Sequence, residues 1–217
     1  MSESRSEPVN SAPREAERPS TPDLNKNLSQ GRDPAVYGLL ALACLLGLLR
    51  FWRLGEWSLW IDEAYTYADG HTGLWAGNVW NPLGYQLILW TVDLVGGRAD
   101  EFSMRLLPAI AGWLCIPLSF WAFREVVGGR RAGLLALLIA VSSWQVYWSQ
   151  NARFYTFAMA VSLLGAGIVL RGLWRGRASL TVSGTLVVVM GTAFHVTASL
   201  VVPALLCAPL LIRLRSA

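Results

Sequence analysis

The stretch from residue 82 to residue 97, PLGYQLILWTVDLVGG, decides how the rest of the chain is arranged. It is apolar over most of its length, but it includes Gln86 and Asp93. It is also slightly shorter than the 17–25 residues with which a helix usually crosses a bilayer. The stretch therefore predicts either a short transmembrane span or a helix that lies in the membrane interface.

The composition around this stretch is typical of an integral membrane protein. Of the 217 residues, 54% are hydrophobic and only 15% are charged, whereas a soluble domain averages about 25% charged residues. The net charge of +4 does not indicate nucleic acid as a partner, because the arginines sit at the ends of apolar runs and form no basic stripe. Six runs are long enough to be spans: 35–52, 104–123, 131–148, 154–170, 178–194 and 196–212. The three cysteines, Cys44, Cys115 and Cys207, lie inside these runs and are predicted to be packing residues.

The positions of the arginines distinguish the two arrangements of residues 82–97. If this stretch lies in the interface, the arginine clusters within 124–131, 171–177 and 213–215 share one face with the N-terminal segment. That pattern satisfies the positive-inside rule, and a spanning helix at 82–97 would violate it at the first two clusters. The sequence therefore predicts an all-α membrane protein with about six transmembrane helices. Its long first external loop, about 53–103, would contain interfacial helices.

Two further patterns agree with this topology. Residues 1–34 are rich in Ser, Pro, Glu and Arg, and we expect a disordered cytoplasmic tail ahead of a membrane module at 35–217. Indole side chains favour the headgroup region, and seven tryptophans fall at the predicted outer ends or in the external loop. They are Trp52, Trp57, Trp60, Trp75, Trp80, Trp144 and Trp148.

Polar residues from distant segments converge on the predicted outer face. They are Asp62 and Glu63, Asn81, Arg105, the segment Gln150-Asn151-Ala152-Arg153 with the following Tyr155, and His195. Each also has an ordinary structural explanation: acidic residues favour the first turn of a helix, arginines extend to headgroups, and a histidine packs. The chemical interpretation is a carboxylate base beside arginines that bind a phosphate. Two histidines without ligand spacing predict no metal site, although a divalent ion at Asp62 remains an alternative that we do not expect.

Five segments of the chain resemble motifs of polytopic glycosyltransferases of the GT-C fold, the relatives of protein O-mannosyltransferases and aminoarabinose transferases. SLWIDEAY (58–65) is similar to their acidic first-loop motif, and NPLGY (81–85) to their His-Pro-Pro-Leu-Tyr segment. FSMRLLP (102–108) resembles their entry into the second span, and YWSQNARFY (147–155) their Tyr-Ser-Gln-Glu-Ala-Arg-Met-Tyr motif. His195 falls where many members carry Thr-His-Tyr. The likeness extends over about residues 36–212.

This resemblance implies an inverting transfer of a sugar from a polyprenyl phosphate to a glycan, lipid or protein acceptor at the outer face of a bacterial inner membrane. It makes Asp62 the general base and Glu63 its support or an acceptor-binding residue. Arg105 and Arg153 would bind the lipid phosphate, with help from His195, and no cofactor is implied. Asn81 and Asn151 stand where the family has His and Glu, which puts their acceptor contacts in doubt.

Family members usually continue with further spans, so we expect the chain to be an N-terminal module of such an enzyme. It would then be a truncated form, a minimal form, or one half of a split enzyme whose partner chain supplies the missing helices. The alternative is a non-catalytic remnant or a partner subunit of another transferase. A transporter is disfavoured, because the predicted spans carry essentially no ionisable residue at their centres.

Overall fold

The computed structural model describes residues 33–71 and 82–207, and every regular element in these ranges is a helix. This confirms the predicted all-α class. The first part contains α2 (Pro34–Gly47), the 3-10 helix η1 (Leu48–Phe51) and α3 (Ile61–His71). The second part contains α4 (Pro82–Leu94), α5 (Glu101–Val127), α6 (Gly129–Val141), α7 (Ser143–Ser149), α8 (Tyr155–Trp174), α9 (Ala178–Gly191) and η2 (Val196–Leu200). The predicted tail at 1–34 lies almost entirely outside the described residues, and Asn81 lies outside them too.

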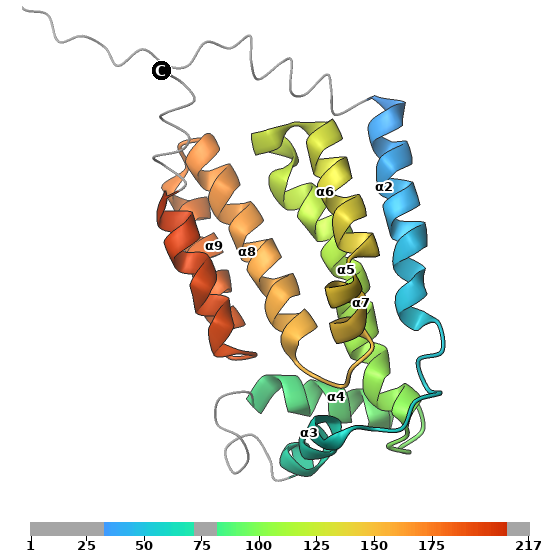
Figure 1. Ribbon diagram of the computed structural model, residues 1–217. Helices are drawn as coiled ribbons and strands as arrows, with labels where there is room; N and C mark the ends of the chain where they lie inside the picture. The colour runs from blue at the N-terminus through green and yellow to red at the C-terminus, as the bar shows by residue number, and fades with distance from the viewer. Residues whose placement is uncertain (1–32, 72–81, 208–217) are drawn as a thin grey trace, which may run out of the picture.

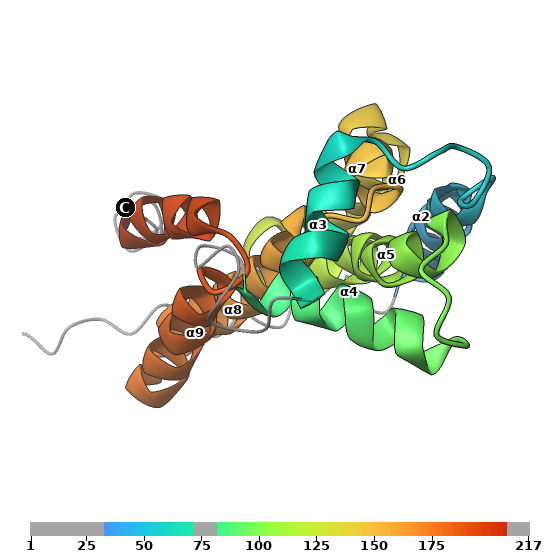
Figure 2. The same cartoon turned by 90° about the horizontal axis from the view of Figure 1, so that it is seen from below.

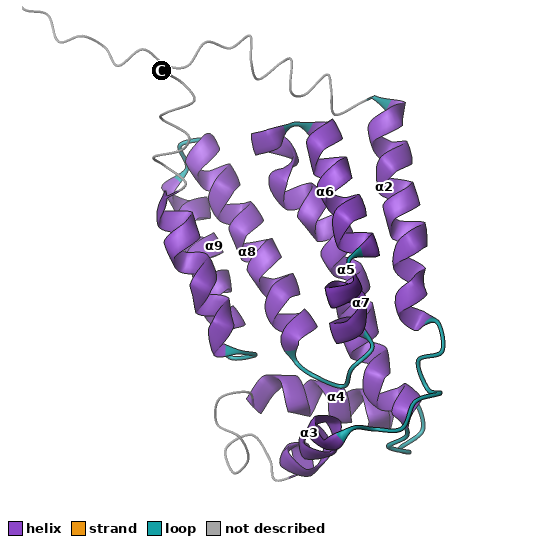
Figure 3. Ribbon diagram, in the orientation of Figure 1, coloured by secondary structure: helices purple, strands orange, loops and turns teal. Residues whose placement is uncertain are grey.

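The helices form an elongated bundle with a cover at one end. α2, α5, α6, α8 and α9 run along one common direction, whereas α3 and α4 lie across one end of the bundle (Figures 1 and 2). We call this the loop end, because the connections from η1 to α3 and from α7 to α8 also run there (Figure 3). α4 comprises most of the stretch 82–97. It lies across the end of the bundle and does not run along it.

Three helical segments are long and apolar enough to cross a membrane. They are Pro34–Phe51, Glu101–Val127 and Tyr155–Trp174. A fourth candidate is the bent pair of α6 and α7, whose axes differ by 59°. Ala178–Gly191 and Val196–Cys207 are apolar but shorter. The described residues thus support a membrane protein with three or four candidate spans, and the count of six stays a prediction.

The bend between α6 and α7 interrupts the predicted span at 131–148. Ser142 lies at the break, and its hydroxyl accepts a hydrogen bond from Gln145 N at 3.5 Å at the start of α7. The break leaves carbonyl groups of α6 without helical partners in an apolar environment, where such groups must be satisfied. Arg50, which is fully buried, donates to the carbonyls of Ala140 (3.0 Å) and Ile139 (2.8 Å). The sequence around Arg50 carries no signal that predicts this role.

The loop end is held to the bundle by an apolar cluster that α4 shares with α5 and α8. Tyr85 and Ile88 of α4 are buried against Met104 of α5 and against Phe154 and Phe157 at the start of α8. These five residues come from three separate segments of the chain. The cluster fixes the crosswise helices directly over the residues that link α7 to α8.

The opposite end of the bundle carries ion pairs between neighbouring helices. Arg130 is 3.0 Å from Asp33, which joins α6 to the start of α2. Arg171 of α8 and Arg175, which directly follows α8, both contact Glu125 of α5, at 3.1 and 2.9 Å. The arginine-rich turns therefore lie at the same end as the start of α2. This is the distribution on which the predicted topology depends, although the orientation in a membrane stays a prediction.

Helices α8 and α9 approach each other closely through two glycines. A Cβ atom added at Gly165 would lie only 2.8 Å from the backbone nitrogen of Val188 and 2.9 Å from the carbonyl oxygen of Gly184. Neither of these backbone atoms can move without shifting a helix. Close contact through small residues is a common basis of helix association in membranes.

Gly165→Ala should therefore push α8 and α9 apart and lower the stability of the bundle by about 1–3 kcal/mol, the usual cost of overpacking. The matched control is Gly38→Ala in α2, because an added Cβ at Gly38 meets no atom within 4 Å. Thermal denaturation in detergent, followed by the fraction that remains monodisperse, measures both variants. Equal stability of the two variants would contradict the close packing of α8 and α9.

Candidate functional site

The start of α5 is defined by a reciprocal cap that places Arg105 in its second turn. Asp100 accepts a hydrogen bond from the backbone N–H of Ser103 at 2.8 Å, and its own N–H donates to the Ser103 hydroxyl at 3.1 Å. These bonds from Ser103 hold the pKa of Asp100 below its ordinary value, so this carboxylate stays ionised at the positive end of the helix. The cap therefore sets the position from which Arg105 reaches back to the first loop.

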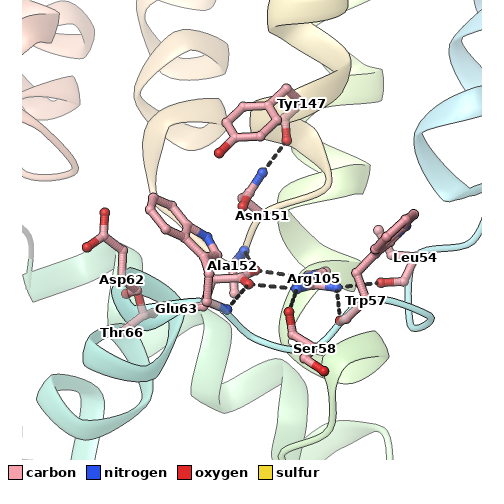
Figure 4. Close-up of polar contacts among 11 residues, drawn as sticks. Leu54, Trp57, Ser58, Asp62, Glu63, Thr66, Arg105, Tyr147, Asn151 and Ala152 are labelled. Atoms are coloured by element: carbon pink, nitrogen blue, oxygen red, sulfur yellow. Dashed lines mark hydrogen bonds and ion pairs between the residues drawn. The ribbon is translucent and has the colours of Figure 1, made fainter.

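Arg105 is almost fully buried, and all five of its N–H donors have partners inside the protein. It donates to the backbone carbonyls of Leu54 (3.2 Å), Trp57 (2.8 Å) and Ser58 (3.2 Å). Its Nε and Nη2 atoms donate to the two carboxylate oxygens of Glu63, at 2.8 and 2.6 Å (Figure 4). No donor is left for a phosphate. In this structure Arg105 holds the first loop in place, which replaces the phosphate-binding role expected from the sequence.

Glu63 is equally saturated. Its side chain is fully buried, and each carboxylate oxygen accepts two hydrogen bonds. Besides the two bonds from Arg105, the backbone N–H of Ala152 donates at 2.7 Å and that of Trp60 at 3.2 Å. Glu63 therefore joins α3, α5 and the segment before α8. Of the two roles expected for it, support of the neighbouring carboxylate fits this geometry, and direct binding of an acceptor does not.

Asp62 lies beside this network, but its carboxylate takes no part in it. Its half-buried side chain points away from the Arg105 guanidinium (Figure 4). Its carboxylate makes no hydrogen bond to any residue in the described part of the chain, whereas its backbone carbonyl accepts bonds from Arg153 Nη1 (2.8 Å) and from the Thr66 hydroxyl (3.1 Å). The backbone is thus held on both sides while the carboxylate stays available.

Arg153 has unused hydrogen-bonding capacity at the same place. Its Nη1 also donates to the Thr66 hydroxyl at 3.0 Å, and its guanidinium lies 4.7 Å from the Phe154 ring centroid and 5.7 Å from that of Tyr85. Its Nε is buried without a partner among the described residues, and no bond from Nη2 is found there. Buried donors are rarely left unsatisfied except at sites with a role for them. Arg153 is therefore the arginine of this site that fits an incoming anion.

His195 completes the group from the turn after α9. Its ring stacks on Phe154, with centroids 5.0 Å apart and an interplanar angle of 15°, and it contacts Tyr155 at 5.1 Å. The backbone N–H of Thr197 donates to Nδ1 at 3.2 Å, so the neutral ring carries its proton on Nε2. Burial, and to a lesser extent the charge of Arg153, lower the pKa of His195 below its ordinary value. The ring is then a neutral hydrogen-bond donor at neutral pH.

An apolar groove begins at His195 and runs along the bundle. It has a volume of about 690 Å³, and its walls come from α5, α7, α8 and the helical segment after His195. Trp148 and Tyr155 line it near the link between α7 and α8, Ala166 lies further along α8, and Phe123 lines it near the far end of α5. The hydroxyl of Thr156, buried without a partner among the described residues, belongs to a lining residue. The dimensions and lining suit a long apolar chain better than a compact polar ligand.

The remaining predicted residues have structural contacts. The side chain of Gln150 donates to the backbone carbonyl of Trp52 at 2.9 Å, which ties the α7–α8 link to the end of the first span. Asn151 is buried and donates to the Tyr147 carbonyl at 2.6 Å. Tyr155 lines the apolar groove. Within residues 33–71 and 82–207, no three His, Cys, Asp or Glu side chains are grouped closely enough to hold a metal ion.

Thr66 is the residue of the site that sequence reasoning missed. It is buried, and its hydroxyl connects Arg153 with the carbonyl of Asp62. A signal was present, because residues four positions apart share one face of a helix and Thr66 follows Asp62 at that spacing.

Comparison of the chain with protein-family models, with curated proteins and with solved structures found no match in any of the three.

The buried pair of Glu63 and Arg105 predicts a large loss of stability when one partner is neutralised. Glu63→Gln leaves the Arg105 charge buried without a counter-charge, which should cost about 3–5 kcal/mol of unfolding free energy. The control is Glu56→Gln, which breaks an exposed pair with Arg53 in the same loop and should cost less than about 1 kcal/mol. Denaturant or thermal unfolding in detergent measures the difference. Similar losses for the two variants would show that the buried pair does not hold the loop.

The lowered pKa of His195 predicts a pH-dependent contribution to stability. Because the unfolded chain binds a proton at a higher pH than the folded chain, His195 destabilises the fold as the pH falls below about 6.5. The wild type should therefore lose more thermal stability between pH 7.5 and pH 5.5 than His195→Gln does. His71 and the acidic residues are common to both proteins, so the difference isolates His195. An identical loss in both would contradict the buried position of the ring.

Proposed function

We propose that the chain is a membrane glycosyltransferase of the GT-C type, or the N-terminal module of one, that uses a polyprenyl-phosphate sugar as donor. The proposal depends on one observation above all. A carboxylate without a partner in the described residues, that of Asp62, stands on a backbone held by Arg153, whose own guanidinium still has donors to offer. This arrangement, at one end of a bundle of apolar helices, supports Asp62 as a base and Arg153 as an anion-binding group.

The proposed reaction is a single displacement at the anomeric carbon. Asp62 takes the proton of an acceptor hydroxyl, and the hydroxyl oxygen attacks the sugar carbon from the side opposite to the phosphate. The bond from that carbon to the phosphate oxygen breaks, and its electron pair leaves with the lipid phosphate. The products are a glycosylated acceptor of inverted configuration, a lipid phosphate and a protonated Asp62, which returns its proton to water.

Two groups are suited to stabilise the departing phosphate. Arg153 supplies a fixed positive charge, and His195 supplies an N–H donor from a ring that stays neutral at neutral pH. Charge stabilisation of this kind requires donors that are in place before the reaction. Stacking on Phe154 and the bonds to Thr66 and Asp62 provide that order. Arg105 has no part in this step, since its donors are all engaged.

The apolar groove fits the lipid part of the donor. It begins beside His195 and continues between α7 and α8, so a phosphate at Arg153 would leave a prenyl chain free to lie along it. Such a chain would be shared between the protein and the surrounding lipid acyl chains. The membrane would then supply the donor laterally, without passage through water.

The same proposal includes a topology. We infer six spans, with α9 and Val196–Cys207 as the two short ones, and with the arginine-rich end facing the cytoplasm. This orientation obeys the positive-inside rule and puts Asp62 on the extracytoplasmic face of a bacterial inner membrane. It also puts α3 and α4 at the level of the lipid headgroups.

Asp62→Asn should reduce sugar transfer by about 10²–10⁴-fold, the usual contribution of a general base, without loss of the folded protein. The assay is transfer from a radiolabelled polyprenyl-phosphate sugar in membranes that contain the full chain. Glu56→Gln serves as the control, because Glu56 lies in the same loop but is exposed and outside the site. Transfer by Asp62→Asn at the wild-type rate would rule out the proposed base. Transfer by neither protein, with a panel of donors, would favour a partner-subunit role.

A further inference from the structure

A second cleft lies between the two crosswise helices, away from the apolar groove. It has a volume of about 330 Å³ and is lined by Tyr67 and His71 of α3 and by Gln86, Trp90 and Asp93 of α4, among others. None of these residues takes part in the proposed transfer step. The helices α3 and α4, which supply these residues, lie across the loop end of the bundle (Figure 2).

The hydrogen bonds already made in this cleft leave mainly acceptors free. The amide nitrogen of Gln86 donates to the Gly70 carbonyl at 2.6 Å, which leaves the amide oxygen available. The Nδ1 atom of His71 is 2.8 Å from the Tyr67 carbonyl, so Nδ1 carries the proton and Nε2 becomes an acceptor. Asp93 adds a carboxylate with no side-chain partner in the described part of the chain. These three groups match a ligand that brings several donors.

Aromatic rings stand among these acceptors. Trp90 is 60% exposed and Tyr67 is 41% exposed, and both side chains line the cleft. The Tyr67 ring also lies 4.3 Å from that of His71. Exposed ring faces beside separate acceptors suit a molecule with both apolar faces and hydroxyl groups. No arginine or lysine is among the described residues that line the cleft, and the Asp93 charge disfavours phosphates and carboxylates.

We propose that the cleft binds a neutral saccharide. The pyranose ring would lie against Trp90, and its hydroxyls would donate to Gln86, His71 and Asp93. A cationic amine is the competing ligand, because aromatic rings and a carboxylate also attract cations. A single positive charge would engage Asp93 and leave the neutral acceptors of Gln86 and His71 without a partner. The number and separation of the acceptors therefore favour hydroxyl groups.

The position of the cleft on α3 indicates which substrate of the proposed reaction it would bind, and this step rests on the proposed function. Asp62 and His71 lie at opposite ends of α3, roughly 13 Å apart along the axis at 1.5 Å per residue. A single sugar in the cleft cannot reach the Asp62 carboxylate. The acceptor is then an oligosaccharide, with one unit in the cleft and its terminal hydroxyl at Asp62.

Saturation-transfer NMR on the full chain in nanodiscs, free of sugar-based detergent, tests the cleft without requiring catalysis. The probes are maltotriose and cellotriose. Binding of at least one is expected in the wild type and in Trp52→Ala, and it should be lost in Trp90→Ala and weakened in Asp93→Asn. Trp52→Ala is the matched control, because Trp52 is 70% exposed and lines neither cleft.

Three results would overturn the saccharide site: no binding of either probe, equal binding by Trp90→Ala, or displacement of the sugar by choline chloride. Where transfer is measurable, Trp90→Ala should raise KM for the bound trisaccharide and leave kcat unchanged. If the wild type binds a probe through Trp90 but transfers no sugar to any acceptor, the proposed transferase fails and the saccharide site stands.

Discussion

The buried ion pair between Glu63 and Arg105 is the interaction on which the loop end depends. Removing two charges from water is expensive, and in this protein every bonding position of both groups is used. Arg105 donates five hydrogen bonds and Glu63 accepts four, two of which they share. The partners belong to the first loop, to α5 and to the segment before α8. A loop that would otherwise be free to move over the membrane surface is therefore held at three points, and the start of α3 is held with it.

This constraint separates the roles of two neighbouring carboxylates. Consecutive residues of a helix point in different directions, so the turn that buries Glu63 must present Asp62 elsewhere. The Glu63 carboxylate is fully used in holding the fold together. The Asp62 carboxylate keeps its hydrogen-bonding capacity, because Arg153 and Thr66 bind only the backbone carbonyl of this residue. Arg105 and Arg153 differ in the same way: all donors of Arg105 are engaged, whereas Arg153 keeps donors without a partner among the described residues. The order of the site and the availability of its reactive groups thus have a common origin.

The class of fold was predictable, because apolar runs and the positions of arginines follow from the solvent that surrounds each helix. The crosswise course of α4 was also foreseeable from its short length and polar residues. The break at Ser142 was not, because nothing before it in the sequence indicates that Arg50 would be buried to satisfy the freed carbonyls. Likewise, Arg105 and Arg153 look equivalent as sequence, each standing at the predicted outer start of an apolar run. Only the geometry shows that the donors of one are exhausted, since pairing over a separation of 42 residues has no local signature.

The loop end also has two separate binding surfaces near the start of α3, one apolar and one polar. The apolar groove is lined by Tyr155 and His195, whose rings contact Phe154 next to Arg153, whereas the cleft lined by Trp90 lies between the crosswise helices. The transfer that we propose, from a lipid-bound donor to an oligosaccharide acceptor, would use this division, because a prenyl tail and a polyhydroxyl acceptor cannot share one lining. In this proposal, the Asp62 carboxylate and the Arg153 guanidinium act between the groove that holds the donor and the cleft that holds the acceptor. Under the proposed function, the rigid clamp at Glu63 would serve the chemistry as well as the fold, since a base that moved with a flexible loop could not stay aligned with a donor anchored in the bilayer.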